Sequence, residues 1–302
     1  MRVDKITAGG TTLVLFEAGA PVDDVEEVLD TTGIALVRGL GIEAAEEFHD
    51  AVGRFGEPLT SYRGGNTPRS KVSDGIFTST EYPAEFEISL HNELSYAKTW
   101  PRRLFFCCLV ASRSGGETPV CDGRALLASL DSEVRQRFVE RGVVYRQHLH
   151  GGYGLGKSWQ QTFETDDRAE VERFLAGADM TYEWTEDDGL RTAAARPATQ
   201  LHRGDEVWFN QADQWHPSTL PPAEHQALLE LVDTEADLPH SVGYGDGTPI
   251  SPADLDHVRR AAKTNELALP WQTGDLLIVD NMLALHGRRP YTGPRRILVS
   301  MI

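Results

Sequence analysis

The sequence has little cysteine and no long hydrophobic run. Its three cysteines, Cys107, Cys108 and Cys121, are an odd number without C-x-x-C or zinc-site spacing, so we expect reduced core residues in a cytoplasmic protein. No apolar run approaches the roughly 18 residues that span a bilayer. The first residues, MRVDKITAGGTTLVLF, lack the regions of a secretory signal. We therefore expect neither membrane insertion nor export.

Positive charge is also scarce. The chain has 29 Lys and Arg against 46 Asp and Glu, a formal net charge of −17, and no basic stripe with interleaved aromatic residues. Such a chain repels a polyphosphate backbone, so nucleic acid is not expected as a partner. What is present is 302 residues with 40% hydrophobic content, enough for a large core. Without a repeat or a dividing linker, we predict one domain over residues 1–302.

Periodicity predicts a mixed chain of strands and helices. Strands are expected at 11–17, 32–40 and 104–111, and further short strands follow to the C-terminus. Helices are expected at 21–32, 41–56, 125–142, 167–179, 222–234 and 251–265, the last with the N-cap Ser251 followed by Pro252. Residues 57–85 favour long loops around a short strand. Residues 151–200 form an insertion that either closes over a site as a lid or is a surface excursion.

Polar and apolar residues alternate before position 93. On a strand, side chains two residues apart share a face, so we predict a strand that directs His91 and Glu93 to one point. Alternation alone does not tell whether the polar face meets solvent or lines a wet cavity. The residues predicted to share that face are Glu87, Ser89, His91 and Glu93.

Two histidines and one carboxylate form the ligand set of the facial triad that holds non-haem Fe(II) with open positions. His91 and Glu93 have the first spacing, and His286 is a candidate for the distal ligand. The spacing alone is weakly specific. The neighbouring motifs are more specific: GGETP follows the first pair, GD-x4-DN precedes His286, and an arginine lies on the next strand.

From about Tyr62 to Ile302 the sequence resembles the TauD/TfdA-like family of Fe(II)- and 2-oxoglutarate-dependent dioxygenases. Within that family it is most similar to the syringomycin-type (SyrP-like) amino-acid hydroxylase branch. The resemblance implies a mainly β fold with flanking helices (α+β) and a double-stranded β-helix, or jelly-roll, core. It rests on the phrases TSTEYP, LHNELSY, FFC, GGETPVCDGR, VWFNQA, YGDGTPI and WQTGDLLIVDNMLALHGRRPYTGPRRILVSM.

The resemblance implies that His91, Glu93 and His286 hold the iron. It also implies that Thr118 contacts the 2-oxoglutarate carboxylate and that Arg296 grips the distal carboxylate. A guanidinium suits that task because it donates two parallel hydrogen bonds. Taken singly, these residues have structural interpretations as core, turn or surface residues. Taken jointly and in this order, they favour the functional interpretation.

The same resemblance bears on the substrate. Related halogenases have a small residue at the position of Glu93, so this carboxylate implies oxygen insertion. Taurine-type members have a second arginine four residues after the first, whereas this chain has Ser300, which disfavours a sulfonate. We further expect Glu87 and Ser89 to line the pocket, with an amino group of the substrate at Glu87 unless that carboxylate is only an exposed salt-bridge partner.

The implied reaction consumes 2-oxoglutarate and O2, releases succinate and CO2, and hydroxylates an unactivated C–H bond in natural-product biosynthesis. The implied substrate is an amino acid or a metabolite derived from one, free or tethered to an acyl or peptidyl carrier protein. Desaturation or epoxidation remains open, as do a metal-dependent isomerase, an oxygenase that does not use 2-oxoglutarate, and a silent jelly-roll that only binds metal or metabolite. The close basic residues that carrier docking would use are Lys98, Arg102 and Arg103.

Overall fold

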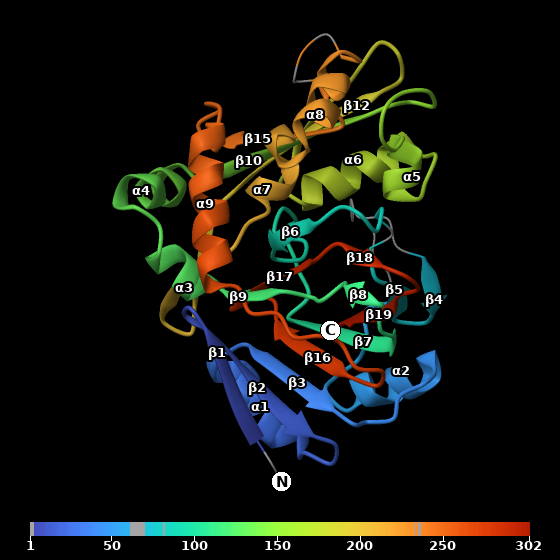
Figure 1. Ribbon diagram of the computed structural model, residues 1–302. Helices are drawn as coiled ribbons and strands as arrows, with labels where there is room; N and C mark the ends of the chain where they lie inside the picture. Colours follow the sequence, from blue (N-terminus) through green and yellow to red (C-terminus); the bar gives the residue numbers. More distant parts are fainter. Residues whose placement is uncertain (1–2, 61–69, 81, 233, 235–236) are drawn as a thin grey trace.

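A computed structural model describes residues 3–60, 70–80, 82–232, 234 and 237–302. The lower half of Figure 1 is built on one large sheet, antiparallel except where β2 pairs with β3. In spatial order its eight strands are β1 (Val3–Ala8), β2 (Thr11–Glu17), β3 (Ile34–Arg38), β16 (Leu276–Asp280), β7 (Arg103–Val110), β19 (Arg296–Met301), β5 (Ile76–Thr78) and β4 (Lys71–Ser73).

Two N-terminal helices cover the outer face of this sheet. Helix α1 (Val22–Thr31) buries Val25 and Leu29, and α2 (Ala45–Gly53) buries Phe48 and Val52, in one apolar cluster with the sheet. Their apolar residues recur at helical spacing, so one stripe of each helix faces the strands. Both helices lie in the blue lower part of Figure 1, with β2 and β3.

A smaller sheet faces the inner surface of the large one. Its strands, in order, are β6 (Ile88–His91), β17 (Ala284–Arg288) and β9 (Val120–Asp122). Apolar side chains from both sheets fill the space between them, among them Phe106 and Ile297 from the large sheet and Ala284 from the small one. Two facing antiparallel sheets around one core confirm the predicted jelly-roll.

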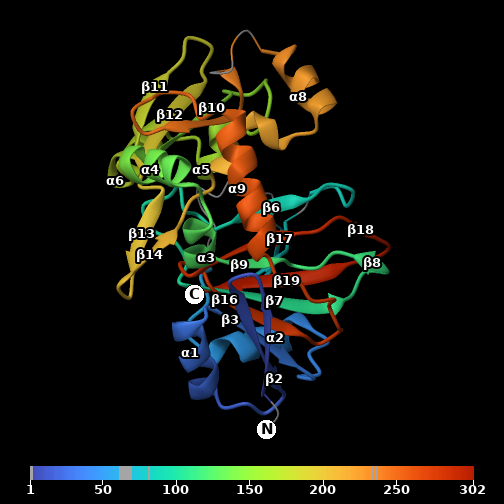
Figure 2. The same ribbon diagram turned by 60° about the vertical axis from the view of Figure 1, so that its left-hand side comes forward.

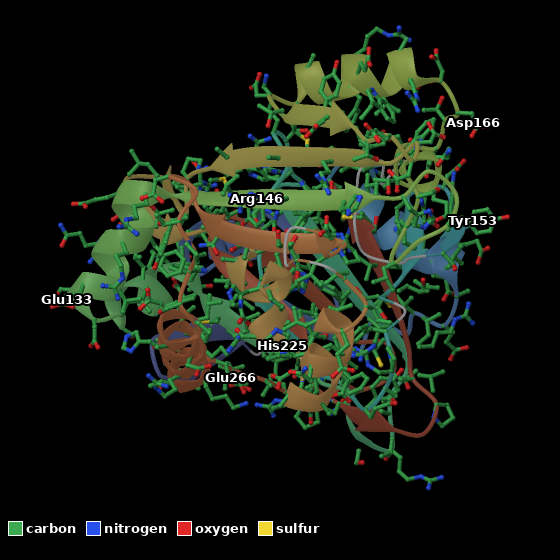
Figure 3. The ribbon with its side chains drawn as sticks, turned by 90° about the horizontal axis from the view of Figure 1, so that it is seen from above. Glu133, Arg146, Tyr153, Asp166, His225 and Glu266 are labelled. Carbon is green, nitrogen blue, oxygen red and sulfur yellow. The ribbon has the colours of Figure 1, made fainter. Side chains whose placement is uncertain are left out.

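The chain between β9 and β16 forms an upper layer and a hairpin that reaches down beside α3 (Figure 1 and Figure 2). The layer contains a sheet of β11 (Thr181–Trp184), β12 (Leu190–Arg196), β10 (Val143–Leu149) and β15 (His240–Tyr244), and the hairpin consists of β13 (Thr199–His202) and β14 (Asp205–Trp208). Figure 3 shows this layer from above, with Arg146 on β10. Its α-helices are α3 (Gly123–Ala128), α4 (Ser132–Arg141), α5 (Trp159–Phe163), α6 (Arg168–Gly177), α7 (Ala212–Trp215), α8 (Pro222–Leu229) and α9 (Pro252–Asn265).

Helix α9 connects the two layers, running from the upper layer down to the small sheet (Figure 2). It begins as predicted, since the Ser251 hydroxyl accepts a hydrogen bond from the Asp254 N–H. The single helix predicted at 125–142 is wrong. The chain takes an extended conformation at Asp131, so that α3 and α4 form two helices whose Leu126 and Phe138 are buried in the same cluster.

The structure describes the predicted loop region 57–85 only in part and the predicted insertion 151–200 in full. Residues 61–69 and 81, within the loops expected at 57–85, lie outside the described residues. The segment 151–200 contains α5, α6, β11 and β12, and its function as a lid stays a prediction. In the part of the chain that the structure describes, no helix has both the length and the apolar composition needed to cross a bilayer.

Candidate metal centre and cosubstrate cavity

The two candidate histidines are brought together by adjacent strands. His91 at the end of β6 pairs directly with His286 on β17, and their ring centroids are 4.3 Å apart. Gly287 permits this approach, because an added Cβ would lie 2.6 Å from the carbonyl oxygen of Ile88. Residues distant in sequence therefore meet through strand pairing.

Glu93 reaches the same point by a different route from the one predicted. Strand β6 ends at His91, and Glu93 lies in the turn that follows, so the prediction of a strand through Glu93 is wrong. Its Oε2 nevertheless lies 3.9 Å from the Nε2 of His91 and 3.7 Å from the Nε2 of His286. The ligand atoms of the three residues all lie within 4.8 Å of one another, and all three residues are buried.

The hydrogen bonds of His91 leave one ring nitrogen facing this cluster. Its Nδ1 lies 2.9 Å from the carbonyl oxygen of Ser89 and 3.0 Å from the side-chain nitrogen of Gln214. Both contacts are made by Nδ1, so Nε2 is the ring nitrogen that faces Glu93. Two imidazoles and a carboxylate on one side of a shared point fit a divalent ion such as Fe(II) with open positions.

A small cavity of about 30 Å³ adjoins the two histidines. Thr118, predicted at the cosubstrate carboxylate, lines it and is buried. The arginine of this wall is Arg295, whereas the predicted Arg296 is exposed and does not line the cavity. The pairing of β19 with β7 shifts register between Arg296 and Ile297. The extra residue of this irregular pairing lies on β7, so alternation along the other strand is kept: Arg295 shares the phase of Ile297 and Val299, which face the inner core, whereas Arg296 shares the phase of Leu298 and Ser300.

A second arginine, which the sequence analysis missed, lies in the same wall. Arg288 and Arg295 both approach the ring of Tyr291, with guanidinium carbons 5.3 and 5.4 Å from its centroid. Burial, followed by the charge of Arg288, lowers the pKa of Arg295 to about 10, so this guanidinium remains cationic at neutral pH. Within the described residues neither arginine makes an ion pair with a carboxylate. A cavity with two such cations and a threonine hydroxyl suits an anionic ligand.

The three predicted substrate residues lie away from this cavity. Ser300 faces the other side of the large sheet, where its buried hydroxyl donates to the carbonyl of Gly75. The pairing of β6 with β17 shifts register between Ile88 and His91. As a result Ile88 lines the histidine cavity in place of Ser89. Glu87 and Ser89 instead line a separate cavity of about 420 Å³ below α9. The predicted common phase with the ligands is thus wrong.

The basic cluster considered for carrier docking does not form one surface. Arg103 is fully buried and pairs with Asp280, Glu26 and Asp30. Lys98 pairs with Asp179 at 2.8 Å. Arg102 is exposed. Alternation could not reveal that Arg103 begins a central strand with three carboxylates around it.

The chain is similar to a known protein family and to relatives in a bacterium and a plant. The family model described as "Taurine catabolism dioxygenase TauD, TfdA family" matches residues 7–301. The dapdiamide synthesis protein DdaC of Enterobacter agglomerans is 36% identical over 280 residues, covering 92% of this chain and 84% of that protein. A clavaminate synthase-like protein of Arabidopsis thaliana is 33% identical over 288 residues, covering 92% and 83%.

Solved structures show the same fold. PvcB, an Fe, alpha-ketoglutarate dependent oxygenase from an isonitrile synthetic pathway, matches with a TM-score of 0.57 at 19% identity, covering 100% of this chain and 91% of that chain. AAD-2, solved in complex with Mn(II) and N-oxalylglycine, matches with a TM-score of 0.56 at 14% identity, covering 100% and 97%. These likenesses cover this chain in full and show that it shares the fold of those structures.

Proposed function

The chain belongs to the TauD/TfdA dioxygenase family and is an Fe(II)- and 2-oxoglutarate-dependent oxygenase; from this premise we propose that it hydroxylates an unactivated C–H bond of an amino acid or of a metabolite derived from one. The observation that carries the proposal is the convergence of His91, Glu93 and His286 beside a cavity lined by Arg295. A protein that only bound metal would not need a cationic cavity at the metal centre.

We assign each residue a task. His91, Glu93 and His286 would hold Fe(II), while Arg295 would donate to the distal carboxylate of 2-oxoglutarate and Thr118 would contact a cosubstrate carboxylate. With O2, the bound metal and 2-oxoglutarate supply oxidative decarboxylation to succinate and CO2, and with it the power to oxidise a C–H bond. Phe106 and Val299 in the same wall keep water from the site. Because the carboxylate of Glu93 is present, we propose oxygen insertion, not halogenation.

The substrate class is proposed from the relatives and from the larger cavity. DdaC takes part in dapdiamide synthesis by its name, which supports a natural-product pathway for this chain as well. Glu87 lines the larger cavity and is positioned to meet an amino group of the substrate.

A sulfonate is not proposed as the substrate group. With Arg295 as the inward arginine, the residue four positions later is Val299, which also lines the histidine cavity and has no charge. We favour a free amino acid over a carrier-tethered one, because Arg103 is buried and Lys98 is already paired with Asp179.

The test is a screen of amino acids for substrate-dependent succinate release with Fe(II), 2-oxoglutarate and O2. We expect at least one amino acid to stimulate succinate release and to gain one oxygen atom by mass spectrometry; loss of two hydrogens would indicate desaturation instead. Anaerobic Fe(II) and 2-oxoglutarate together should give a weak visible absorption band that neither gives alone. If neither the band nor succinate appears with the wild-type protein, the oxygenase assignment fails.

A second experiment tests whether Glu87 contacts an amino group of the substrate. Glu87→Gln keeps the size of the side chain but removes its charge, so the KM for the amino acid should rise about 10-fold or more, as expected for a lost charge-assisted hydrogen bond. The affinity for 2-oxoglutarate should stay unchanged. Glu133→Gln, on the exposed start of α4 (Figure 3), is the control and should leave both values unchanged. An unaltered KM in Glu87→Gln would exclude the contact.

A further inference from the structure

Glu93 differs from the two histidines in how its backbone is held. His91 and His286 lie on paired strands, whereas Glu93 lies in a turn beyond the end of β6. The next residue, Leu94, has a φ of 55°, in the left-handed region that leucine rarely adopts. Another contact must therefore set the direction of the Glu93 side chain.

The side chain of Asn281 makes that contact. Its Oδ1 accepts a hydrogen bond from the Glu93 N–H at 2.7 Å, and its Nδ2 donates to the Glu93 carbonyl at 2.9 Å. The same Nδ2 donates to the carbonyl of Pro101 at 3.0 Å. One carboxamide thus gives Glu93 the two backbone bonds that a neighbouring strand would give, and also fixes the far end of the loop.

The backbone of Asn281 is itself held by two hydrogen bonds. Asn92 donates from Nδ2 to the carbonyl of Asn281 at 2.7 Å, and the Asn281 N–H donates to the carbonyl of Arg102 at 3.0 Å. Both asparagines are fully buried. The side chain of Asn92 thus binds the backbone of Asn281, while the side chain of Asn281 binds the backbone of Glu93. This reciprocal pair of contacts, called the clamp below, leaves the turn little freedom.

The clamp also joins Glu93 to the strand that carries the distal histidine. Asn281 lies in the turn between β16 and β17, where the Asp280 carboxylate accepts from the N–H groups of Met282 and Leu283 at 2.9 and 3.1 Å. Strand β17 continues to His286, which pairs with His91. Asn281 is the link that fixes the turn residue against the two strand residues.

We propose that Asn281 is a positioning residue that holds the Glu93 carboxylate in line with His91 and His286 for metal binding, without touching the metal. The proposal rests on the proposed function only in taking these three residues as the ligands. Only a carboxamide of this length supplies one acceptor and two donors here. Outer partners of metal ligands typically change metal affinity about 10- to 100-fold when they are removed.

The test compares two buried asparagines. Asn265 at the end of α9 also accepts one hydrogen bond, from the Gly10 N–H, and donates two, to Ser129 and Ala261. We expect Asn281→Ala to weaken Co(II) binding about 10- to 100-fold by titration, and Asn265→Ala to leave it unchanged although both lower the melting temperature. Equal Co(II) affinity in wild type and Asn281→Ala, or an equal loss in both variants, overturns the proposal.

Two further measurements keep the test decisive. If Asn281→Ala does not fold, Asn281→Asp still accepts from Glu93 but cannot donate, and should also weaken Co(II) binding. In the metal-free protein, amide hydrogen exchange of residues 93–101 should be faster in either variant than in wild type. Unchanged protection there overturns the clamp even if the enzyme is active. If amide exchange is faster in the variants but the wild-type protein releases no succinate, only the proposed function is contradicted.

Discussion

At the scale of single residues, the arginine pair shows how a one-position shift changes a site. Arg295 and Arg296 are chemically identical, and the sequence predicted that the second faces the cosubstrate. Arg295 shares the inward phase of Ile297 and Val299, and Arg296, one position later, is exposed. Arg295 donates to the carbonyl of Gly116 and the hydroxyl of Ser79, which orient its guanidinium along the cavity wall.

Lysine substitutions separate the two arginines. Arg295→Lys keeps the charge but loses the paired donors, so we expect about 10- to 100-fold weaker 2-oxoglutarate binding, which corresponds to roughly 1.5–3 kcal/mol for a charged hydrogen bond. Arg296→Lys should leave binding unchanged. Isothermal titration of the metal-loaded protein measures both. A larger effect in Arg296→Lys would show that Arg296 turns inward in solution.

At the scale of elements, a buried ion cluster holds the turn that precedes the distal histidine. Arg103 at the start of β7 pairs with Asp280 at the end of β16, and with Glu26 and Asp30 on α1 at 2.7 and 2.8 Å. Burial acts to lower the pKa of Arg103, but the three carboxylates outweigh it and raise that pKa. Helix α1 is thus coupled to the turn that contains Asn281.

Removing Arg103 should destabilise the whole protein. Arg103→Met leaves Asp280, which is 1% exposed, as an uncompensated buried charge, so we expect a loss of about 3–5 kcal/mol in the free energy of unfolding. Arg203 pairs with the same Asp30 but is exposed, and Arg203→Met should cost under about 1 kcal/mol. Urea denaturation compares them. Similar losses in the two variants would argue against a special role for burial.

At the scale of the whole molecule, ligands from opposite ends of the chain meet at one point. His91 and Glu93 come from the first third of the sequence and His286 from its end. Segments between them form the upper layer and α9 (Figure 2). A metal that binds all three residues can therefore bind tightly only to the folded chain.

Metal binding should accordingly stabilise the fold. At about 100 times its Kd, Co(II) should add about 2.7 kcal/mol to the free energy of unfolding and raise the melting temperature by about 5 °C. Glu93→Ala should lose most of this shift, because one of three ligands is gone. Differential scanning fluorimetry with and without Co(II) measures it. An equal shift in the variant would place the metal elsewhere.

The sequence by itself determined the fold class, the family and the ligand types, because ordered motifs and side-chain chemistry are properties of the chain. It also located the strand that contains His91, although not its end, and the capped start of α9. Only the tertiary structure decided that Glu93 lies in a turn, that Arg295 and not Arg296 faces the cavity, that Glu87 and Ser89 line another cavity, and that Asn281 holds Glu93. The physical reason is threefold. An irregular pairing, as in β6, reverses the face of the residues beyond it. Alternation in a sequence does not say which of two faces of a strand points inward, and hydrogen bonds between distant segments leave no periodic trace in a sequence.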